Sequence, residues 1–334
     1  MYSKLEATTS ELTHYKALVA KLPALRQEIG KVIVGQQEAI SEILIALLAG
    51  GHCLLEGVPG LAKTLMVSTM SQALDMSFKR VQFTPDLMPG DIVGTEILEE
   101  DHETGKKFFK FNKGPLFAHV VLADEINRTP PKTQAALLEA MQEGKVTYAG
   151  TDYALPRPFL IIATQNPIEQ AGTYPLPEAQ LDRFLLYVKL DYPSEQEELN
   201  VLKSTTGTSR PVLKTILTDQ DIIDLQRLTR EVHISDELIG YINRLVRASR
   251  PQDSPSDFVK QWCDWGAGPR AGQALVLCAK ANAVLNGRFA VIPEDIHILA
   301  YPILRHRIAL NFKAEAEGIT TDRVIGELIK VVKV

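Results

Sequence analysis

A glycine-rich octapeptide constrains this chain more than any other stretch. The sequence Gly57-Val58-Pro59-Gly60-Leu61-Ala62-Lys63-Thr64 follows the apolar run 52–56 and precedes an apolar-periodic segment that begins at Leu65. This order predicts a strand, a loop and a helix, in which loop N–H groups and the positive end of the helix dipole hold phosphate oxygens. Lys63 would reach the β- and γ-phosphates, and the Thr64 hydroxyl would contact Mg²⁺. We therefore expect residues 57–65 to bind a nucleotide; a Gly/Pro turn that happens to precede Lys-Thr is the alternative.

Ala62 departs from this motif. The pattern G-x-x-x-x-G-K-[ST] has glycine immediately before the lysine, where this chain has alanine. Alanine is the smallest substitution possible, but its Cβ narrows the backbone conformations open to that position. The prediction therefore also depends on the strand and helix patterns on either side.

Polar side chains follow two other apolar runs. Residues 118–123 have the pattern of a buried strand, and Asp124 and Glu125 come directly after it. Because parallel strands carry functional groups at their C-terminal ends, Asp124 is placed to hold Mg²⁺ and Glu125 to activate the attacking water. Asn166 follows the run 159–164 and could hydrogen-bond a water or a γ-phosphate oxygen. The alternatives are a solvated acidic turn and a turn asparagine before Pro167.

Composition and charge argue against several classes of protein. The 334 residues are 45% apolar and 23% charged, which is ordinary for a globular protein with more than one domain. A net charge of −5 and a pI near 5.9 do not suggest a surface that coats nucleic acid or an anionic membrane. Three cysteines without C-x-x-C spacing indicate neither a disulfide framework nor a zinc site. No apolar run is long enough to span a membrane, and we expect a cytoplasmic protein.

The pattern of secondary structure divides the chain into two parts. Residues 1–192 contain strand-like segments that alternate with helical ones, which predicts an α/β domain built on parallel strands. Two β-hairpins interrupt this domain, at about 93–111 and 145–155. Residues 193–334 show helical patterns only, which predicts an all-α second domain. The five predicted strands are 52–56, 78–83, 118–123, 159–164 and 184–190.

Two arginines and one loop are further candidates. Arg183 ends a short helix and is either a solvated cation or an arginine finger that reaches a neighbouring subunit's nucleotide. Arg270 follows the turn 266–269 at a helix start, where a cation opposes the dipole unless a phosphate lies nearby. Val34 and Gly35 lie ahead of the first strand, where a segment either wraps the adenine or packs as a plain turn.

Taken together, these motifs resemble those of an AAA+ ATPase. The octapeptide and the stretch 176–184 (Leu-Pro-Glu-Ala-Gln-Leu-Asp-Arg-Phe) are similar to the MoxR family, in which alanine often precedes the lysine. The resemblance covers nearly the whole chain. Its other motifs are Val-Val-Leu-Ala-Asp-Glu at 120–125, Gln-Asn-Pro at 165–167 and Gly-Ala-Gly-Pro-Arg-Ala at 266–271.

The resemblance implies a fold and roles for particular residues. The implied fold is a P-loop AAA+ protein of the helix-2-insert clade: an αβα three-layer domain with a five-stranded parallel sheet, then an α-helical lid. Asn166 becomes sensor 1, Arg183 an arginine finger acting in trans, and Arg270 sensor 2. The hairpins become the helix-2 insert and the pre-sensor-1 hairpin. Candidates for contact with a client are Lys106, Lys107, Phe108 and Phe109.

The implied activity is hydrolysis of ATP with Mg²⁺ between adjacent subunits of a homo-hexamer. The implied role is a chaperone-like remodelling or maturation motor that acts on a protein client with a von Willebrand factor A domain partner. A metal-chelatase motor subunit is one alternative. A nucleic-acid-dependent ATPase is less favoured, because the chain is acidic and lacks a separate binding domain, so no nucleic-acid partner is expected. An inactive nucleotide-dependent scaffold is disfavoured by the complete set of catalytic groups.

Overall fold

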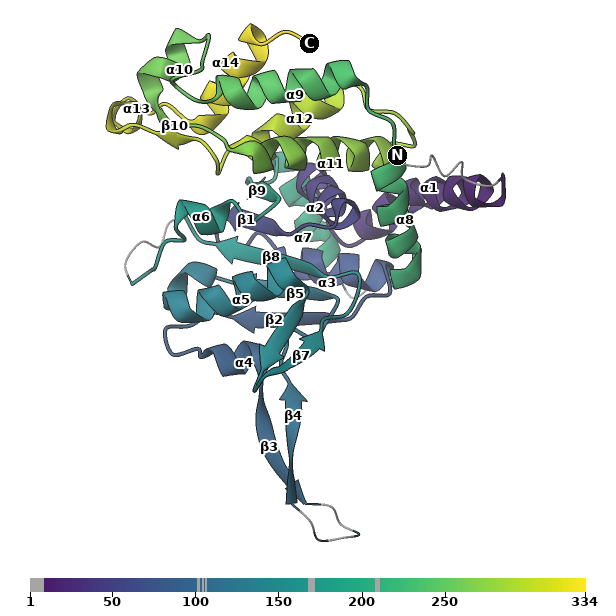
Figure 1. Cartoon of the computed structure of the whole chain (residues 1–334). Helices are drawn as coiled ribbons and strands as arrows, with labels where there is room; N and C mark the ends of the chain where they lie inside the picture. Colours follow the sequence, from purple (N-terminus) through teal and green to yellow (C-terminus); the bar gives the residue numbers. More distant parts are fainter. Residues whose placement is uncertain (1–8, 101–102, 104, 106, 168–171, 208–210) are drawn as a thin grey trace, which may run out of the picture.

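A five-stranded parallel sheet lies at the centre of the molecule, with strand order β2-β5-β8-β1-β9 (Figure 1). The computed structural model describes residues 9–100, 103, 105, 107–167, 172–207 and 211–334. Each strand of the sheet coincides closely with a predicted one, and the predicted fold class is confirmed. The strands are β1 (Cys53–Gly57), β2 (Phe78–Gln82), β5 (Val120–Asp124), β8 (Leu160–Gln165) and β9 (Leu186–Leu190).

Alternate residues of these strands face opposite sides of the sheet and enter two separate cores. Cys53 and Leu55 pack with α1 (Thr9–Gly30), α2 (Gln37–Ala49) and α3 (Lys63–Ala73). Leu54, between them, packs on the other side with α4 (Pro89–Val93) and α5 (Pro131–Glu143). Both faces of the sheet are therefore covered, as a parallel sheet requires.

The chain after β9 is mainly helical and includes a helical lid. Its helix α11 packs against α2 and α8, and the first core continues from the sheet into the lid without interruption. In Figure 1 the lid helices α9, α11 and α12 lie on one side of the sheet. The helices are α7 (Glu195–Thr205), α8 (Asp219–Glu231), α9 (Asp236–Ala248), α10 (Asp257–Trp262), α11 (Pro269–Leu285), α12 (Pro293–Leu304), α13 (Phe312–Ala316) and α14 (Thr321–Val331). Among the described helices, none combines the length and apolar character that a membrane span needs.

The lid differs from the all-α expectation in one detail. It contains a short antiparallel pair, β10 (Cys263–Trp265) and β11 (Ala309–Leu310). Strands of two or three residues are too short to show an alternating pattern, so sequence periodicity could not reveal them. The pair holds Trp265 at the surface, where its side chain is 66% exposed.

Two hairpins project from the α/β part. β3 (Gly94–Glu100) pairs with β4 (Lys107–Lys113), and β6 (Lys145–Tyr148) pairs with β7 (Thr151–Ala154). Phe111 of β4 stacks on Tyr153 of β7, with 4.3 Å between ring centroids, and lies 5.0 Å from Tyr148 of β6. The hairpins are therefore joined by aromatic contacts, while strands β3 and β4 extend away from the body (Figure 1). Lys106, a predicted client contact, lies outside the described residues.

Candidate nucleotide-binding site

The glycine-rich loop joins the end of β1 to the first turn of α3. Ala62 has φ 54° and ψ 28°, in the left-handed region, and Gly60 has φ 90°. Successive N–H groups in such a turn point into the loop and make a backbone anion site. An alanine in this conformation costs about 1 kcal/mol more than a glycine. The departure from the motif at position 62 therefore adds a small strain and leaves the loop geometry intact.

Lys63 is the first residue of α3, and its side chain returns over the loop. Its Nζ donates a hydrogen bond of 2.6 Å to the carbonyl oxygen of Gly57. Burial lowers the pKa of the Lys63 ammonium, while the nearby carboxylates of Asp124 and Glu125 oppose that shift. The ammonium is thus positioned where the negative charge of a phosphate would further stabilise it.

A pocket of about 470 Å³ opens above this loop. The C-terminal ends of the adjacent strands β5, β8 and β1 meet there, which brings together side chains far apart in the sequence. Three separately predicted groups therefore share one cavity: the loop, the acidic pair and Asn166. The lining comprises Pro59, Gly60, Leu61, Ala62, Lys63, Thr64, Leu65, Arg80, Gln82, Asp124, Glu125 and Asn166.

Asp124 is buried, and both of its carboxylate oxygens accept hydrogen bonds. Thr164 Oγ1 donates to Oδ1 at 2.6 Å. Arg80 donates to Oδ2 from Nε at 3.1 Å and from Nη2 at 2.6 Å. Thr164 lies fully buried in β8, whereas Arg80 reaches across from the neighbouring strand β2. The carboxylate is therefore held from the core side and from the solvent side.

Glu125 leaves the strand with a left-handed backbone, φ 58° and ψ 50°. Its N–H donates to Thr164 Oγ1 at 2.9 Å, so one hydroxyl positions both acids. Its Oε2 accepts from Gln82 Nε2 at 2.6 Å and lies 3.1 Å from Arg128 Nε. A non-glycine residue in this region is strained, and such strain is common where a side chain must point into a site.

Sequence reasoning missed Arg80, Gln82 and Thr164. Thr164 lies within a predicted strand, and its role depends on pairing between β5 and β8. Arg80 and Gln82 lie two residues apart on β2, so both point to the same face beside β5. Two polar residues on one face near the C-terminal end of a predicted strand were the available signal.

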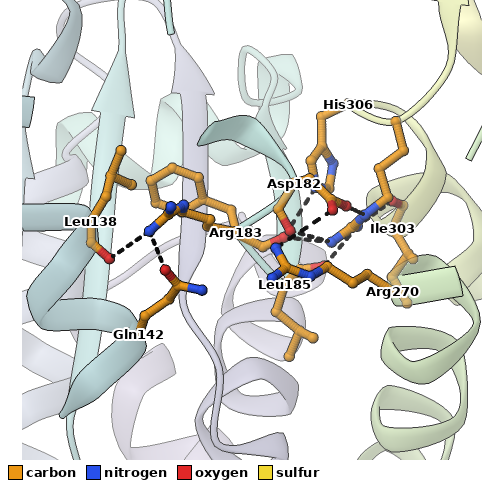
Figure 2. A network of polar contacts seen from close by, with 10 residues as sticks. Leu138, Gln142, Asp182, Arg183, Leu185, Arg270, Ile303 and His306 are labelled. Atoms are coloured by element: carbon orange, nitrogen blue, oxygen red, sulfur yellow. Dashed lines mark hydrogen bonds and ion pairs between the residues drawn. The ribbon is translucent and has the colours of Figure 1, made fainter. Parts of the chain in front are cut away.

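Arg183 and Arg270 lie elsewhere. Figure 2 shows Arg183 directed toward α5, where its Nη1 donates to the Leu138 carbonyl at 3.5 Å and contacts Gln142 Oε1. Arg270 approaches Asp182 from the lid, with 3.7 Å between Nη1 and Oδ2. Among the described residues that line the nucleotide pocket, neither arginine occurs.

Asp182 lies between these two arginines and connects them to the lid. Together with Arg307, these residues (Asp182, Arg183 and Arg270) form what we call the Asp182 cluster. It follows α6 (Glu178–Leu181), and its Oδ1 accepts from Arg307 Nε at 2.7 Å. The Arg307 side chain is only 4% exposed and also donates to the carbonyl of Phe184 at 2.8 Å. Burial lowers the pKa of Arg307, and its hydrogen bond to the Asp182 carboxylate opposes that effect. Asp182 is thus both a neighbour of Arg183 in the chain and the counter-ion of a buried lid arginine.

Val34 and Gly35 lie in the loop between α1 and α2. Gly35 has φ 73°, and a Cβ on it would lie 2.9 Å from Glu197 Oε1. The next residue, Gln36, donates from Nε2 to the Asp191 carbonyl at 2.7 Å. The loop therefore packs against the connection from β9 to α7, and its contact with adenine stays a prediction.

The oxygen donors of the pocket suit Mg²⁺. The Thr64 hydroxyl and the Asp124 carboxylate lie in the same cavity, and hard oxygen ligands are those that Mg²⁺ prefers. Within the described parts of the chain, no three His, Cys, Asp or Glu side chains form a cluster that could hold a metal alone. A cation here would therefore take ligands from nucleotide phosphates as well, as Mg²⁺ does in other nucleotide sites.

Comparison with protein families defines the class. Residues 52–186 match the ATPase family associated with various cellular activities, and residues 259–328 match the AAA lid domain. The first match contains the loop, both acids and Asn166, and the second contains Arg270. The fold is that of an AAA+ ATPase.

Similar proteins narrow this class to one family. Chaperone MoxR1 of Mycobacterium tuberculosis is 43% identical over 91% of this chain and 80% of its own length. The uncharacterised protein YeaC of Bacillus subtilis is 44% identical over 92% of this chain and 93% of its own length. Protein MoxR of Paracoccus denitrificans is 32% identical over 84% of this chain and 86% of its own length. The chain belongs to the MoxR family.

Solved structures agree with this assignment. The crystal structure of a candidate ATPase from Cytophaga hutchinsonii matches with a TM-score of 0.90 and 44% identity, over 97% of this chain and 98% of that one. A full-length MCM homologue from Methanopyrus kandleri has a TM-score of 0.58 and 17% identity, over 92% of this chain and 64% of that one. The second likeness shows a shared fold.

Proposed function

We propose that this chain hydrolyses Mg-ATP in a ring of identical subunits, a hexamer, and uses the cycle to remodel a protein client. One observation carries the proposal: a single pocket holds the loop, Asp124, Glu125 and Asn166, while Arg183 lies outside it. The pocket contains what is needed to bind a nucleotide and activate water. Stabilising the charge of the transition state calls for an arginine, which a neighbouring subunit would supply.

Residues of one chain have distinct tasks in this proposal. Lys63 and the loop N–H groups hold the β- and γ-phosphates, and Thr64 and Asp124 hold the metal. When bound, Mg²⁺ neutralises charge on the phosphate oxygens. Glu125 orients the attacking water and accepts its proton. Asn166 lines both this pocket and a larger cleft of about 800 Å³ beneath the lid, so it would report the state of the γ-phosphate at that boundary.

Arg183 and Arg270 are assigned to the adjacent subunit's nucleotide. Their positions on either side of Asp182 support this assignment, because both belong to one cluster outside the chain's own pocket (Figure 2). The Arg270 side chain is 54% exposed and its ion pair is long, so little holds it away from an incoming phosphate. We further propose that the chain divides functionally at 192/193, into a nucleotide-binding part and a lid.

The β3–β4 hairpin is the proposed contact with the client. Four large apolar side chains are exposed on it: Ile97, Leu98, Phe108 and Phe109, the last at 71%. Exposed apolar side chains on a projecting element are typical of protein-binding surfaces. The name of the relative Chaperone MoxR1 supports a chaperone-like remodelling role. The proposed von Willebrand factor A domain partner is supported by the family resemblance alone.

The Glu125→Gln substitution tests the proposed activity. The variant keeps the shape of the side chain but cannot accept a proton, so ATP turnover should fall by about 10²- to 10³-fold while nucleotide affinity stays within a factor of about three. Turnover is measured by phosphate release and affinity by fluorescence of a labelled ATP analogue. Glu139→Gln, an exposed acid on α5, is the matched control and should behave like the parent. Parental turnover in Glu125→Gln would refute the assignment of the base.

A further inference from the structure

The proposed mechanism gives no task to the arginine that lines the pocket. Arg80 lines the cavity and makes two hydrogen bonds to Asp124 Oδ2, at 3.1 Å from Nε and 2.6 Å from Nη2. Asp124 is also the carboxylate proposed to hold the metal. A guanidinium and a divalent cation would therefore share one carboxylate as their partner.

The two contacts of Asp124 differ in how readily they can be exchanged. The Thr164 hydroxyl on Oδ1 is fully buried and also accepts the N–H of Glu125, so it is fixed by the sheet. The Arg80 side chain on Oδ2 is 47% exposed and extends from the edge strand β2. A half-exposed arginine can move into water at small cost, because its charge remains solvated. The Oδ2 side is therefore the exchangeable one.

Arg80 is also connected to Glu125. Its Nη2 donates to Gln82 Oε1 at 2.8 Å, and Gln82 Nε2 donates to Glu125 Oε2 at 2.6 Å. An amide has one acceptor end and one donor end, so these two contacts fix the orientation of Gln82. Movement of Arg80 removes one of them. The contacts of the metal-binding acid and of the proposed base are thus part of one chain of hydrogen bonds.

We propose that Arg80 is a positioning residue that competes with Mg²⁺ for the Asp124 carboxylate and thereby sets how strongly nucleotide binding depends on the metal. The inference rests on the proposed function of this pocket. With nucleotide alone, the guanidinium compensates a carboxylate that would otherwise repel the γ-phosphate. When Mg²⁺ is bound, the metal would compensate the charge of the carboxylate, and the positive guanidinium would then repel the metal. Arg80 therefore reduces the difference in nucleotide affinity between the metal-free and the metal-loaded pocket.

The test measures binding alone, without turnover. The dissociation constant of a fluorescent, non-hydrolysable ATP analogue is determined for the full-length chain with excess EDTA and with saturating Mg²⁺. The value in EDTA divided by the value in Mg²⁺ is the ratio that is compared between variants. Arg80→Gln should raise this ratio about two- to fivefold, the effect of a partly exposed charge pair. Arg80→Lys keeps the charge but loses the forked geometry of the guanidinium, so its ratio should lie between those of the parent and Arg80→Gln. Lys79→Gln removes a charge from the opposite face of the same strand and should leave the ratio unchanged.

Each outcome decides the inference. A raised ratio in Arg80→Gln, with Lys79→Gln at the parental value and all variants showing parental circular dichroism, supports it. An unchanged or lowered ratio in Arg80→Gln overturns it while leaving the proposed ATPase function intact. A shift in Lys79→Gln as large as that in Arg80→Gln also overturns it, because net charge would then be the cause. If the parent binds no nucleotide under either condition, the proposed function fails and the inference fails with it.

Discussion

The nucleotide pocket and the Asp182 cluster are assembled in different ways. In the pocket, each polar group follows a strand of one parallel sheet, so strand register brings the groups together. In the cluster, Asp182 meets Arg307, which lies 125 positions further along the chain and belongs to the lid. The pocket is built for contact with a ligand, and the cluster joins the two parts of the chain. In the proposed mechanism, hydrolysis depends on the nucleotide pocket of one subunit and on arginines that the Asp182 cluster of another subunit presents to it.

The largest expected effect is that of Arg183→Ala. If the cluster presents Arg183 to a neighbour's nucleotide, turnover should fall about 10³-fold while nucleotide binding is retained, since an arginine finger acts on the transition state. Phosphate release and analogue binding measure the two quantities. Arg157→Ala, an exposed arginine that lies between β7 and β8, is the control.

Mixing inactive chains separates action in trans from action in cis. Arg183→Ala chains retain Glu125, and Glu125→Gln chains retain Arg183, so a shared interface would contain one intact copy of each. Activity should reappear when the two are combined. A mixture as inactive as its components would mean that Arg183 serves its own chain, and the contrast between the two regions would be lost.

Asp182→Asn should produce the next largest effect, this time on stability. It leaves the Arg307 guanidinium, 4% exposed, without its carboxylate, and breaking a buried ion pair costs about 3 kcal/mol. The carbonyls that also accept from Arg307 moderate this loss. Urea unfolding followed by circular dichroism gives the free energy. Glu178→Gln, an exposed acid one turn earlier, should change it by less than about 0.5 kcal/mol; equal losses in both variants would contradict the ion-pair argument.

Glu42 on α2 should give the smallest effect, a pH dependence. Burial raises the pKa of this carboxyl to about 8, and the positive charge of Arg305 opposes the shift. A raised pKa means that its contribution to stability is fully present below the usual value of 4.5 and is lost as the pH rises through about 8. The parent should therefore lose about 1 kcal/mol more per pH unit than Glu42→Gln between pH 6 and pH 8. Glu38 and Asp322 also act on this group and raise its pKa.

Urea unfolding at pH 6, 7 and 8 measures this difference. Glu237→Gln, an exposed acid on α9, should show the same pH slope as the parent. Parallel slopes for the parent and Glu42→Gln would mean that the carboxyl is not held protonated beneath the lid. The distinction between the ion-paired acids of the pocket and a protonated acid beneath the lid would then need revision.

The same contrast explains how far sequence could go. The strands and the pocket follow from local patterns: an apolar run, then Lys63, or Asp124 and Glu125, or Asn166. Such patterns survive in a single sequence because each strand is a contiguous segment. The contacts of Arg80 depend on which strand lies beside β5, and those of Asp182 depend on how the lid packs. No local sequence pattern predicts either of these contacts, and none predicts the pairing of β10 with β11.

The position of Asp182 has a consequence for the timing of a ring. Its carboxylate is bound to the lid through Arg307 and approached by Arg270, and its carbonyl carbon is bonded to the nitrogen of Arg183. A lid that rotates must either break a buried ion pair or carry the arginine with it. In the proposed ring, the arginine lies in the next subunit's active site. The lid angle of one subunit would therefore set when its neighbour can hydrolyse, and hydrolysis would follow an order around the ring.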